Sequence, residues 1–375
     1  MSGSTSSGIV YAATSASERS RLVALVLICL VAGSAGAQSD GPTSILANAD
    51  DLALLNNWPK AGTLFSQAEH LFGQAGNQRD ALYARVGYIW VTAETGGTGG
   101  LADTDVDRAL RYALSHRDQA LQLRCLVAQA VRERVVNEAA ARHLWEEILG
   151  LATALGDERW KERATAELGE IKYLDGEFAD AERMVKHAVL WQFSHDPGAA
   201  IYYTSLVGNG LVESGQTENG LHYCDVAIGR AAKAGDTGFP FLAYQGKARA
   251  FLALHRRAEA DALLQVALKR ARADGNRAAE AQLLIVAGIG AESPRQAIEY
   301  LQAANDLTRT AGFHHAFAWS SFELAKAYRG TGNIDAAETY ASRGLEAMNG
   351  LEDKFHLPQL VALLADLKAT RGEFA

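Results

Sequence analysis

The chain has 375 residues, of which 48% are apolar by type, and it carries a formal net charge of −8. This length is ample for a large core and exceeds that of one ordinary compact domain. The net negative charge argues against a nucleic-acid-binding protein, which would be expected to carry a basic face, while scarce proline and Ala-rich stretches favour helices.

The first 37 residues have the layout of a secretory signal peptide. Arg19 and Arg21 precede an apolar run of 12 residues (22–33), and a small-x-small cleavage site, AGA, follows at 35–37. The run is shorter than the roughly 20 residues that a membrane span needs. We therefore expect an exported protein, periplasmic or extracellular. The alternative is a membrane protein anchored through residues 22–33.

After a short linker (38–44), the sequence from 45 to 375 repeats with a period of about 40 residues. The clearest copies are 168–189, 207–228, 247–268 and 324–345, with a weaker copy at 284–305 and an early half-copy at 58–72. Successive copies from 168 onward begin 37 to 40 residues apart. This spacing predicts about eight to nine repeats, of which the last is incomplete.

Each repeat is predicted to contain two helices joined by a tight turn. In the copy at 168–189, apolar residues recur at helical spacing before and after Gly176. Between repeats, Gly followed by Asp or Asn recurs at 76–77, 156–157, 235–236 and 275–276, a pattern in which Gly ends one helix and the polar residue caps the next. All six prolines fall at or beside predicted helix starts or turns.

Two interruptions accompany this pattern. The Gly-rich segment TGGTGGLADT (95–104) is predicted to be a long flexible loop in the second unit. The chain ends on GEFA (372–375), the same four letters that stand at the turn of the copy at 168–189. We therefore expect a fragment or truncated product of a longer protein. The alternative is a true terminus whose last helix caps the stack.

The repeats resemble the tetratricopeptide repeat in its longer-period form. The matching residues in the best copy are Leu324, Ala325, Tyr328, Gly332, Ala337 and Leu345. The resemblance covers residues 45–375. It implies an all-α fold, an α-solenoid of stacked antiparallel helix pairs in a right-handed superhelix, in which the first helix of each pair lines the concave face.

The resemblance also implies an interaction scaffold that binds a peptide or helix of a partner protein in the concave groove. The groove positions of the family map onto Tyr202, Ser205, Asn209, Gln245, Arg249, Trp319, Phe322, Lys326 and Arg329. The alternative function is the regulatory or sensor region of a larger enzyme. Its catalytic domain, a CHAT caspase-like peptidase or a signalling kinase or cyclase, would lie beyond residue 375.

Motifs that carry chemistry are weak in this sequence. The segment GLVESGQT (210–217) approaches a P-loop, but Gln216 replaces the phosphate-binding lysine, and the segment is predicted to join two helices. The ten histidines are scattered, and Cys125 and Cys224 lie in units that are not predicted to touch. We expect no catalytic residue, no metal, no cofactor and no disulfide, and hence a non-enzymatic protein.

Overall fold

The computed structural model describes residues 41–96, 103–134, 136–348 and 357–371. The chain divides into Met1–Gly41 and Pro42–Ala375, and the account below concerns the second unit. Among the described residues every regular element is a helix, and none of these helices is long and apolar enough to cross a membrane. The predicted signal peptide, its anchor alternative and the terminal GEFA lie outside the described residues.

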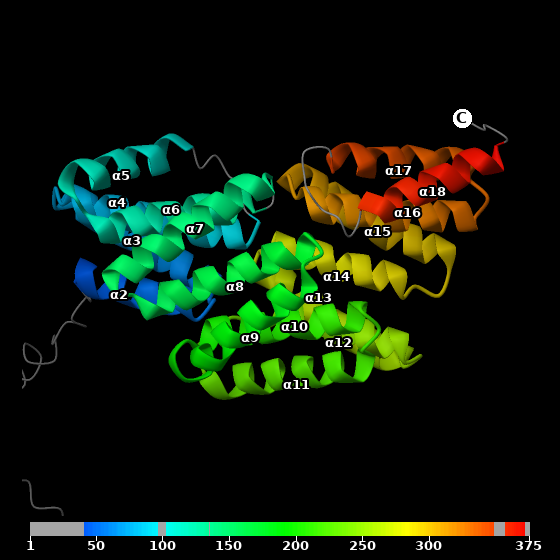
Figure 1. Ribbon diagram of the computed structural model, residues 1–375, viewed down its shortest axis with the longest axis horizontal. Coiled ribbons are helices and arrows are strands. Elements are labelled where there is room, and N and C mark those ends of the chain that lie inside the picture. Colours follow the sequence, from blue (N-terminus) through cyan, green and yellow to red (C-terminus); the bar gives the residue numbers. More distant parts are fainter. Residues whose placement is uncertain (1–40, 97–102, 135, 349–356, 372–375) are drawn as a thin grey trace, which may run out of the picture. The chain divides into compact units, whose positions relative to one another are not determined.

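Seventeen helices follow one another in the described part of the chain: α2 (Pro42–Leu54), α3 (Trp58–Gln74), α4 (Gln78–Glu94), α5 (Asp103–His116), α6 (Gln119–Glu133), α7 (Glu138–Leu155), α8 (Glu158–Leu174), α9 (Phe178–His195), α10 (Pro197–Glu213), α11 (Thr217–Ala234), α12 (Phe241–Ala253), α13 (Arg257–Ala273), α14 (Arg277–Ile289), α15 (Pro294–Ala311), α16 (His314–Gly330), α17 (Ile334–Ala347) and α18 (Leu357–Thr370). They form successive pairs that run from the blue helices through the green to the red in Figure 1.

The predicted pairing is confirmed. From α2 to α16, each even-numbered helix packs against the odd-numbered helix that follows it in the chain. The unit at 168–189 spans the end of α8, the turn at Gly176 and the start of α9. The P-loop-like segment joins α10 to α11, as predicted. The first helix α2 begins at Pro42, three residues before the expected boundary at 45.

The glycine joints have the predicted backbone conformation. Left-handed φ angles occur in Gly76, Gly156, Gly176, Gly215, Gly235, Gly275, Gly312 and Gly332. Asn77, Asp157 and Asn276 then cap the next helix by accepting a hydrogen bond from its third backbone N–H. Asp236 was expected to act in the same way but does not, because α12 begins only at Phe241 after a longer connection.

The left-handed joints give a matched pair of glycines on one helix. Gly156 ends α7 at φ 68°, whereas Gly150 lies in the exposed middle of α7, and a Cβ on either residue would meet open space. We expect Gly156→Ala to lower the free energy of unfolding by about 1 kcal/mol through backbone strain, and Gly150→Ala to raise it by about 0.5–1 kcal/mol. Urea denaturation of both variants measures this difference, and equal effects would contradict the assigned joint.

Small residues allow neighbouring helices to cross closely, as the sequence predicted. A Cβ on Gly208 of α10 would lie 2.8 Å from the Cys224 sulfur of α11, and a Cβ on Gly246 of α12 would meet the same sulfur at 2.8 Å. A larger side chain would force these three helices apart. Cys125 and Cys224 are both buried and free, so no disulfide joins them.

The connection before α12 reaches back to the turn between α2 and α3. The backbone N–H of Gly238 donates to Leu55 O at 3.0 Å, and the Asn57 amide donates to Asp236 O at 2.8 Å. The Asn56 amide also donates to Gly198 O at 3.1 Å, next to the start of α10. These contacts, which we call the closure, join the first pair of helices to the fifth and sixth pairs.

The Gly-rich segment also takes part in long-range packing. Thr95 O accepts a hydrogen bond from the Ala278 backbone N–H at 3.3 Å, and a Cβ on Gly96 would lie 2.2 Å from the Phe313 ring. Helix α5 begins at Asp103, so the last two residues of the predicted loop at 95–104 are helical, whereas its first two form a turn that packs against other parts of the chain. Residues 97–102 lie outside the described part.

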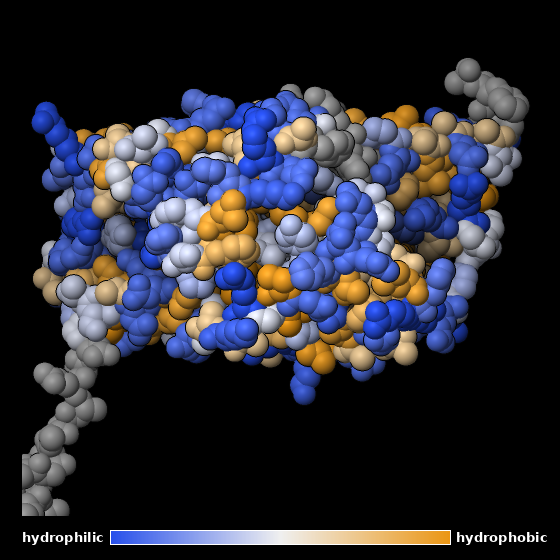
Figure 2. All heavy atoms as spheres, turned by 60° about the horizontal axis from the view of Figure 1, so that its bottom comes forward, coloured by the Kyte–Doolittle hydropathy of each residue, from blue (hydrophilic) through white to orange (hydrophobic). Residues whose placement is uncertain are grey.

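The outer surface mixes hydrophilic and hydrophobic residues. On the face shown in Figure 2, hydrophobic atoms gather near the middle between larger hydrophilic areas. Exposed large apolar side chains are spread over several helices, with Leu190 on α9, Val266 on α13 and Val361 on α18 each at least half exposed. Exposed apolar side chains spread in this way are ordinary on a protein surface.

Candidate ligand-binding cavity

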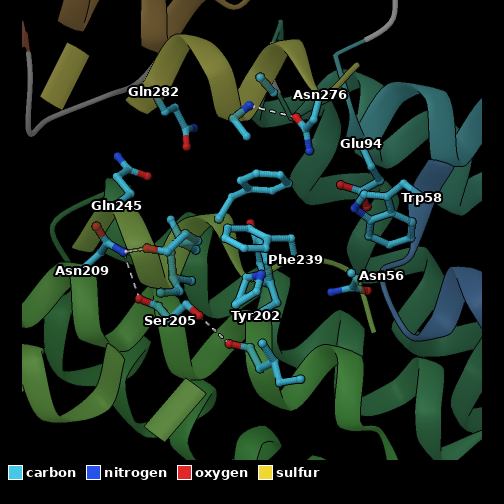
Figure 3. Close-up of a pocket in the computed structure, with 18 of the residues that line it drawn as sticks. Asn56, Trp58, Glu94, Tyr202, Ser205, Asn209, Phe239, Gln245, Asn276 and Gln282 are labelled. Atoms are coloured by element: carbon cyan, nitrogen blue, oxygen red, sulfur yellow. Dashed lines mark hydrogen bonds between the residues drawn. The ribbon is translucent and has the colours of Figure 1, made fainter. Parts of the chain in front are cut away.

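A partly open cavity of about 420 Å³ lies between the first helices of the pairs. Residues from α4, α6, α8, α10, α12, α14 and α16 line it, together with the α2–α3 turn and the connection before α12. In Figure 3, Glu94 and Trp58 lie at one side and Gln245 and Gln282 at the other, with Tyr202 and Phe239 between them. The closure therefore contributes one wall of this cavity.

Six of the nine residues predicted for the groove line this cavity: Tyr202, Ser205, Asn209, Gln245, Arg249 and Trp319. On α10, Tyr202, Ser205 and Asn209 are spaced three and then four residues apart, so they share one face of the helix. This is the face that the predicted register turned inward. A role in binding remains a prediction for all six.

The other three predicted residues do not line the cavity. Phe322 packs against the apolar residues between α16 and α18, the Lys326 ammonium lies 2.7 Å from the Glu323 carboxylate, and the Arg329 guanidinium lies 2.6 Å from Asp366 of α18. The last two turns of α16 therefore join the terminal helices together.

The side of the cavity formed by Asn209 and Gln245, which we call the amide side, presents hydrogen-bond acceptors. The Asn209 amide nitrogen donates to Ser205 O at 3.1 Å and to Leu242 O at 2.7 Å, which fixes the orientation of the amide. Its oxygen is buried and has no hydrogen-bond partner in the described structure, and the same holds for the Gln245 amide oxygen. The Asn209 nitrogen thus links α10 to α12, and the oxygen is left without a hydrogen-bond donor in the described structure.

Aromatic rings form much of the remaining wall. Trp58 packs edge-on against buried Trp90 at 5.7 Å, and Phe239 packs against Tyr244 at 4.5 Å. Arg249 lies over the Trp319 ring at 5.6 Å and pairs with Glu213 at 3.2 Å. These contacts hold the rings in place, so their exposed faces are a preformed apolar surface.

A group of charged residues, which we call the acidic end, lies where α4, α6 and α8 meet. Arg134 at the end of α6 pairs with Glu94 of α4 at 3.0 Å and with Glu167 of α8 at 3.2 Å. Glu167 also accepts a hydrogen bond from the Tyr203 hydroxyl at 2.7 Å. Glu170, one turn further along α8, completes the group, and its Oε2 atom is buried without a hydrogen-bond partner in the described structure.

The protonation of Glu170 follows from this environment. Burial, and then the nearby Glu167 carboxylate, raise the pKa of Glu170 to about 7, although Arg134 acts in the opposite direction. Burial, and then Glu170, likewise raise the pKa of Tyr202 well above its usual value, so its hydroxyl stays protonated. The acidic end therefore gains charge as the pH rises through neutrality.

Glu170→Gln should change how stability depends on pH. A carboxyl with a raised pKa in the folded state binds protons more tightly than it does in the unfolded chain, so stability falls as pH rises from about 4.5 to about 7. We expect the variant to be more stable than the native chain by about 1–3 kcal/mol at pH 8 and similar to it at pH 4.5. Urea denaturation at both pH values tests this, with Glu146→Gln on the exposed face of α7 as control. An equal difference at the two pH values would contradict the account.

Several lining residues were not found from the sequence, among them Trp58, Glu94, Arg134, Glu170 and Phe239. Trp58 and Glu94 belong to early units whose repeat signal is weak. Arg134 and Phe239 lie in connections between helices, where a helical repeat assigns no inward face. The composition of the connection before α12 could have indicated a buried role. Its segment TGFPF (237–241) is apolar and aromatic, whereas most other joints between repeats are polar.

Comparisons with known proteins bear on the fold. No protein-family model matches the chain, and no curated protein matches its sequence. A Rap protein complexed with Competence and Sporulation Factor matches with a TM-score of 0.55 and 16% identity, over 79% of this chain and 88% of that one. The apo form of the quorum sensor NprR from B. thuringiensis matches with a TM-score of 0.53 and 12% identity, over 88% and 95% of the two chains.

These likenesses extend along most of both chains, at identities too low to carry function. They agree with the seventeen described helices, their pairing and the glycine joints between them. The chain therefore has the fold of a tetratricopeptide-like helical-repeat solenoid.

Proposed function

We propose that the chain is a non-enzymatic binding protein that holds a short segment of a partner protein or a free peptide in the cavity. The observation that supports this most strongly is the pair of buried, unpartnered amide oxygens of Asn209 and Gln245. Asn209 is 7% exposed and Gln245 is 5% exposed, so water has little access to either side chain. A buried acceptor without a donor is costly, and peptide N–H groups would satisfy both oxygens.

The hydrogen-bonding needs of the two amides favour an extended segment. An extended segment would expose its backbone N–H groups to Asn209 and Gln245, whereas the N–H groups in the interior of a helix are already paired with its own carbonyl groups.

The fold comparison supports a ligand of this kind by analogy. One similar structure was solved with Competence and Sporulation Factor and the other is a quorum sensor. Both cases place ligand recognition in a helical-repeat chain of similar extent. We carry over the binding role, but neither ligand.

Gln245→Leu tests the proposal without disturbing the fold. The substitution removes an acceptor that has no partner, so stability should change by less than about 1 kcal/mol. The full chain would be immobilised and exposed to a randomised mixture of acetylated pentapeptide amides, and retained peptides would be identified by mass spectrometry. We expect the native chain to retain a defined subset, and the variant to bind those peptides about tenfold more weakly.

Gln265→Leu is the matched control, because Gln265 is exposed on α13, outside the cavity lining. It should retain the same peptides as the native chain. Retention of no peptide by the native chain, or equal retention by the Gln245 variant, would refute the proposed binding site.

A further inference from the structure

The acidic end carries more negative than positive charge. Three carboxylates, Glu94, Glu167 and Glu170, surround one guanidinium, that of Arg134. The two terminal nitrogens of Arg134 donate to two of these carboxylates, Nη1 to Glu167 and Nη2 to Glu94. Glu170 is therefore the carboxylate left over, and no cation among the described residues pairs with it.

Charge elsewhere in the cavity is balanced in pairs. Arg249 pairs with Glu213 at 3.2 Å, and Arg270 pairs with Asp274 at 2.7 Å. The unbalanced negative charge of the lining therefore lies at the acidic end, beside Tyr202 and across from the amide side. A ligand with a positive charge at one end would therefore be oriented with that end toward the acidic end of the cavity.

A second and independent observation concerns hydrogen-bonding type. Four buried oxygens that line the cavity lack a partner in the described structure: Asn56 Oδ1, Glu170 Oε2, Asn209 Oδ1 and Gln245 Oε1. The three amide oxygens are acceptors, and the Glu170 oxygen is an acceptor when the carboxyl is ionised. A ligand that satisfies them must be rich in N–H donors, and a group with several donors and a positive charge fits Glu170 best.

We infer that the segment bound in the cavity carries a positively charged group, a lysine ammonium or an arginine guanidinium, which sits at the acidic end between Glu94 and Glu170. This inference depends on the proposed peptide-binding function. Two aromatic rings in the lining, Trp58 and Tyr202, flank the same place, and aromatic faces attract cations. The positive group would supply the missing partner for Glu170 and orient the segment along the cavity.

The inference is tested with three peptide mixtures that differ at one position. Acetylated pentapeptide amides with uncharged random positions would carry lysine, arginine or norleucine at the centre, where norleucine keeps the chain of lysine without its ammonium. Retention on the immobilised full chain would be measured by mass spectrometry. We expect at least one charged mixture to be retained about tenfold more than the norleucine mixture.

Glu170→Gln should reduce that preference to less than about threefold while leaving retention of the norleucine mixture unchanged. Glu146→Gln, on the exposed face of α7, is the matched control and should behave as the native chain does. Equal retention of charged and norleucine mixtures by the native chain would overturn the charge inference and leave peptide binding standing.

A separate arm covers the case in which no peptide is retained, which would refute the proposed function. Cadaverine, a diamine of similar length to a lysine side chain, would be titrated by calorimetry into the native chain and into Glu170→Gln, with pentanediol as the uncharged comparison. Binding of cadaverine to the native chain alone supports the cationic site. Absence of binding to the native chain, or equal binding to both chains, overturns it.

Discussion

Arg163→Met is expected to lower the free energy of unfolding by about 3–5 kcal/mol, because the buried Asp196 carboxylate loses its two-bond partner and keeps the Ala199 backbone N–H at 3.2 Å and the partly exposed Arg159 at 4.0 Å. Arg163 Nε lies 2.6 Å from one oxygen of Asp196 and Nη2 lies 2.9 Å from the other. Asp196 is 1% exposed, so it cannot recover its partner from water. Nη2 also donates to Leu54 O at 2.7 Å, a contact that links α8 to the end of α2.

The measurement is urea denaturation at neutral pH, followed by circular dichroism. Lys186→Met is the control, since Lys186 pairs with Glu182 on the exposed surface of α9 and such a pair contributes less than about 1 kcal/mol. A loss below about 1 kcal/mol for Arg163→Met would show that the buried pair does not hold the first helices to the middle of the chain.

Gly238→Ala is expected to open the closure. A Cβ on Gly238 would lie 2.0 Å from Asn56 O, which is a backbone atom and cannot rotate away. The α2–α3 turn must therefore move, and the hydrogen bonds from Gly238 to Leu55 and from Asn57 to Asp236 would be lost with it. We expect a destabilisation of about 2–4 kcal/mol.

Hydrogen exchange distinguishes opening from general unfolding. In Gly238→Ala, amides of the α2–α3 turn and of the connection before α12 should exchange faster, while α15 and α16 stay protected. Gly229→Ala on α11 is the control, because a Cβ there meets open space in a helix, and it should stabilise the chain by about 0.5–1 kcal/mol. Unchanged exchange at the turn in Gly238→Ala would refute the closure.

The helix pairs could be predicted because their physical causes are local. Glycine at a left-handed joint, proline at a helix start and apolar spacing of 3.6 residues all act within one unit. Each of these patterns is weak in a single repeat, but its recurrence in several repeats makes the assignment of helices clear. Six predicted groove residues line the cavity for the same reason, since Tyr202, Gln245 and Trp319 come from helices whose repeat register was well defined.

The closure could not be predicted, because periodicity concerns neighbouring units only. Leu55 and Gly238 are far apart in the sequence, and their contact depends on the summed curvature of the helix pairs between them. This curvature comes from the small rotation between each helix pair and the next, which cannot be read from the sequence of a single repeat. The acidic end was missed for a related reason: Glu94, Arg134 and Glu170 come from three different units.

Three predicted groove residues lie beyond the end of the cavity. Phe322, Lys326 and Arg329 follow Trp319 on the same helix, where Phe322 packs against apolar residues of α17 and α18. Arg329 is about half exposed and pairs with Asp366 of α18. A repeat register assigns an inward direction to every turn of a helix, whereas the cavity reaches only the first turns of α16.

Hydrogen exchange with and without a retained peptide tests most directly whether the cavity between the first helices is the binding site. The account predicts slower exchange on binding in α10, α12, α14 and α16, and little change in the second helices α11, α13 and α15. Slower exchange confined to those second helices, or none anywhere despite saturation with peptide, would contradict it.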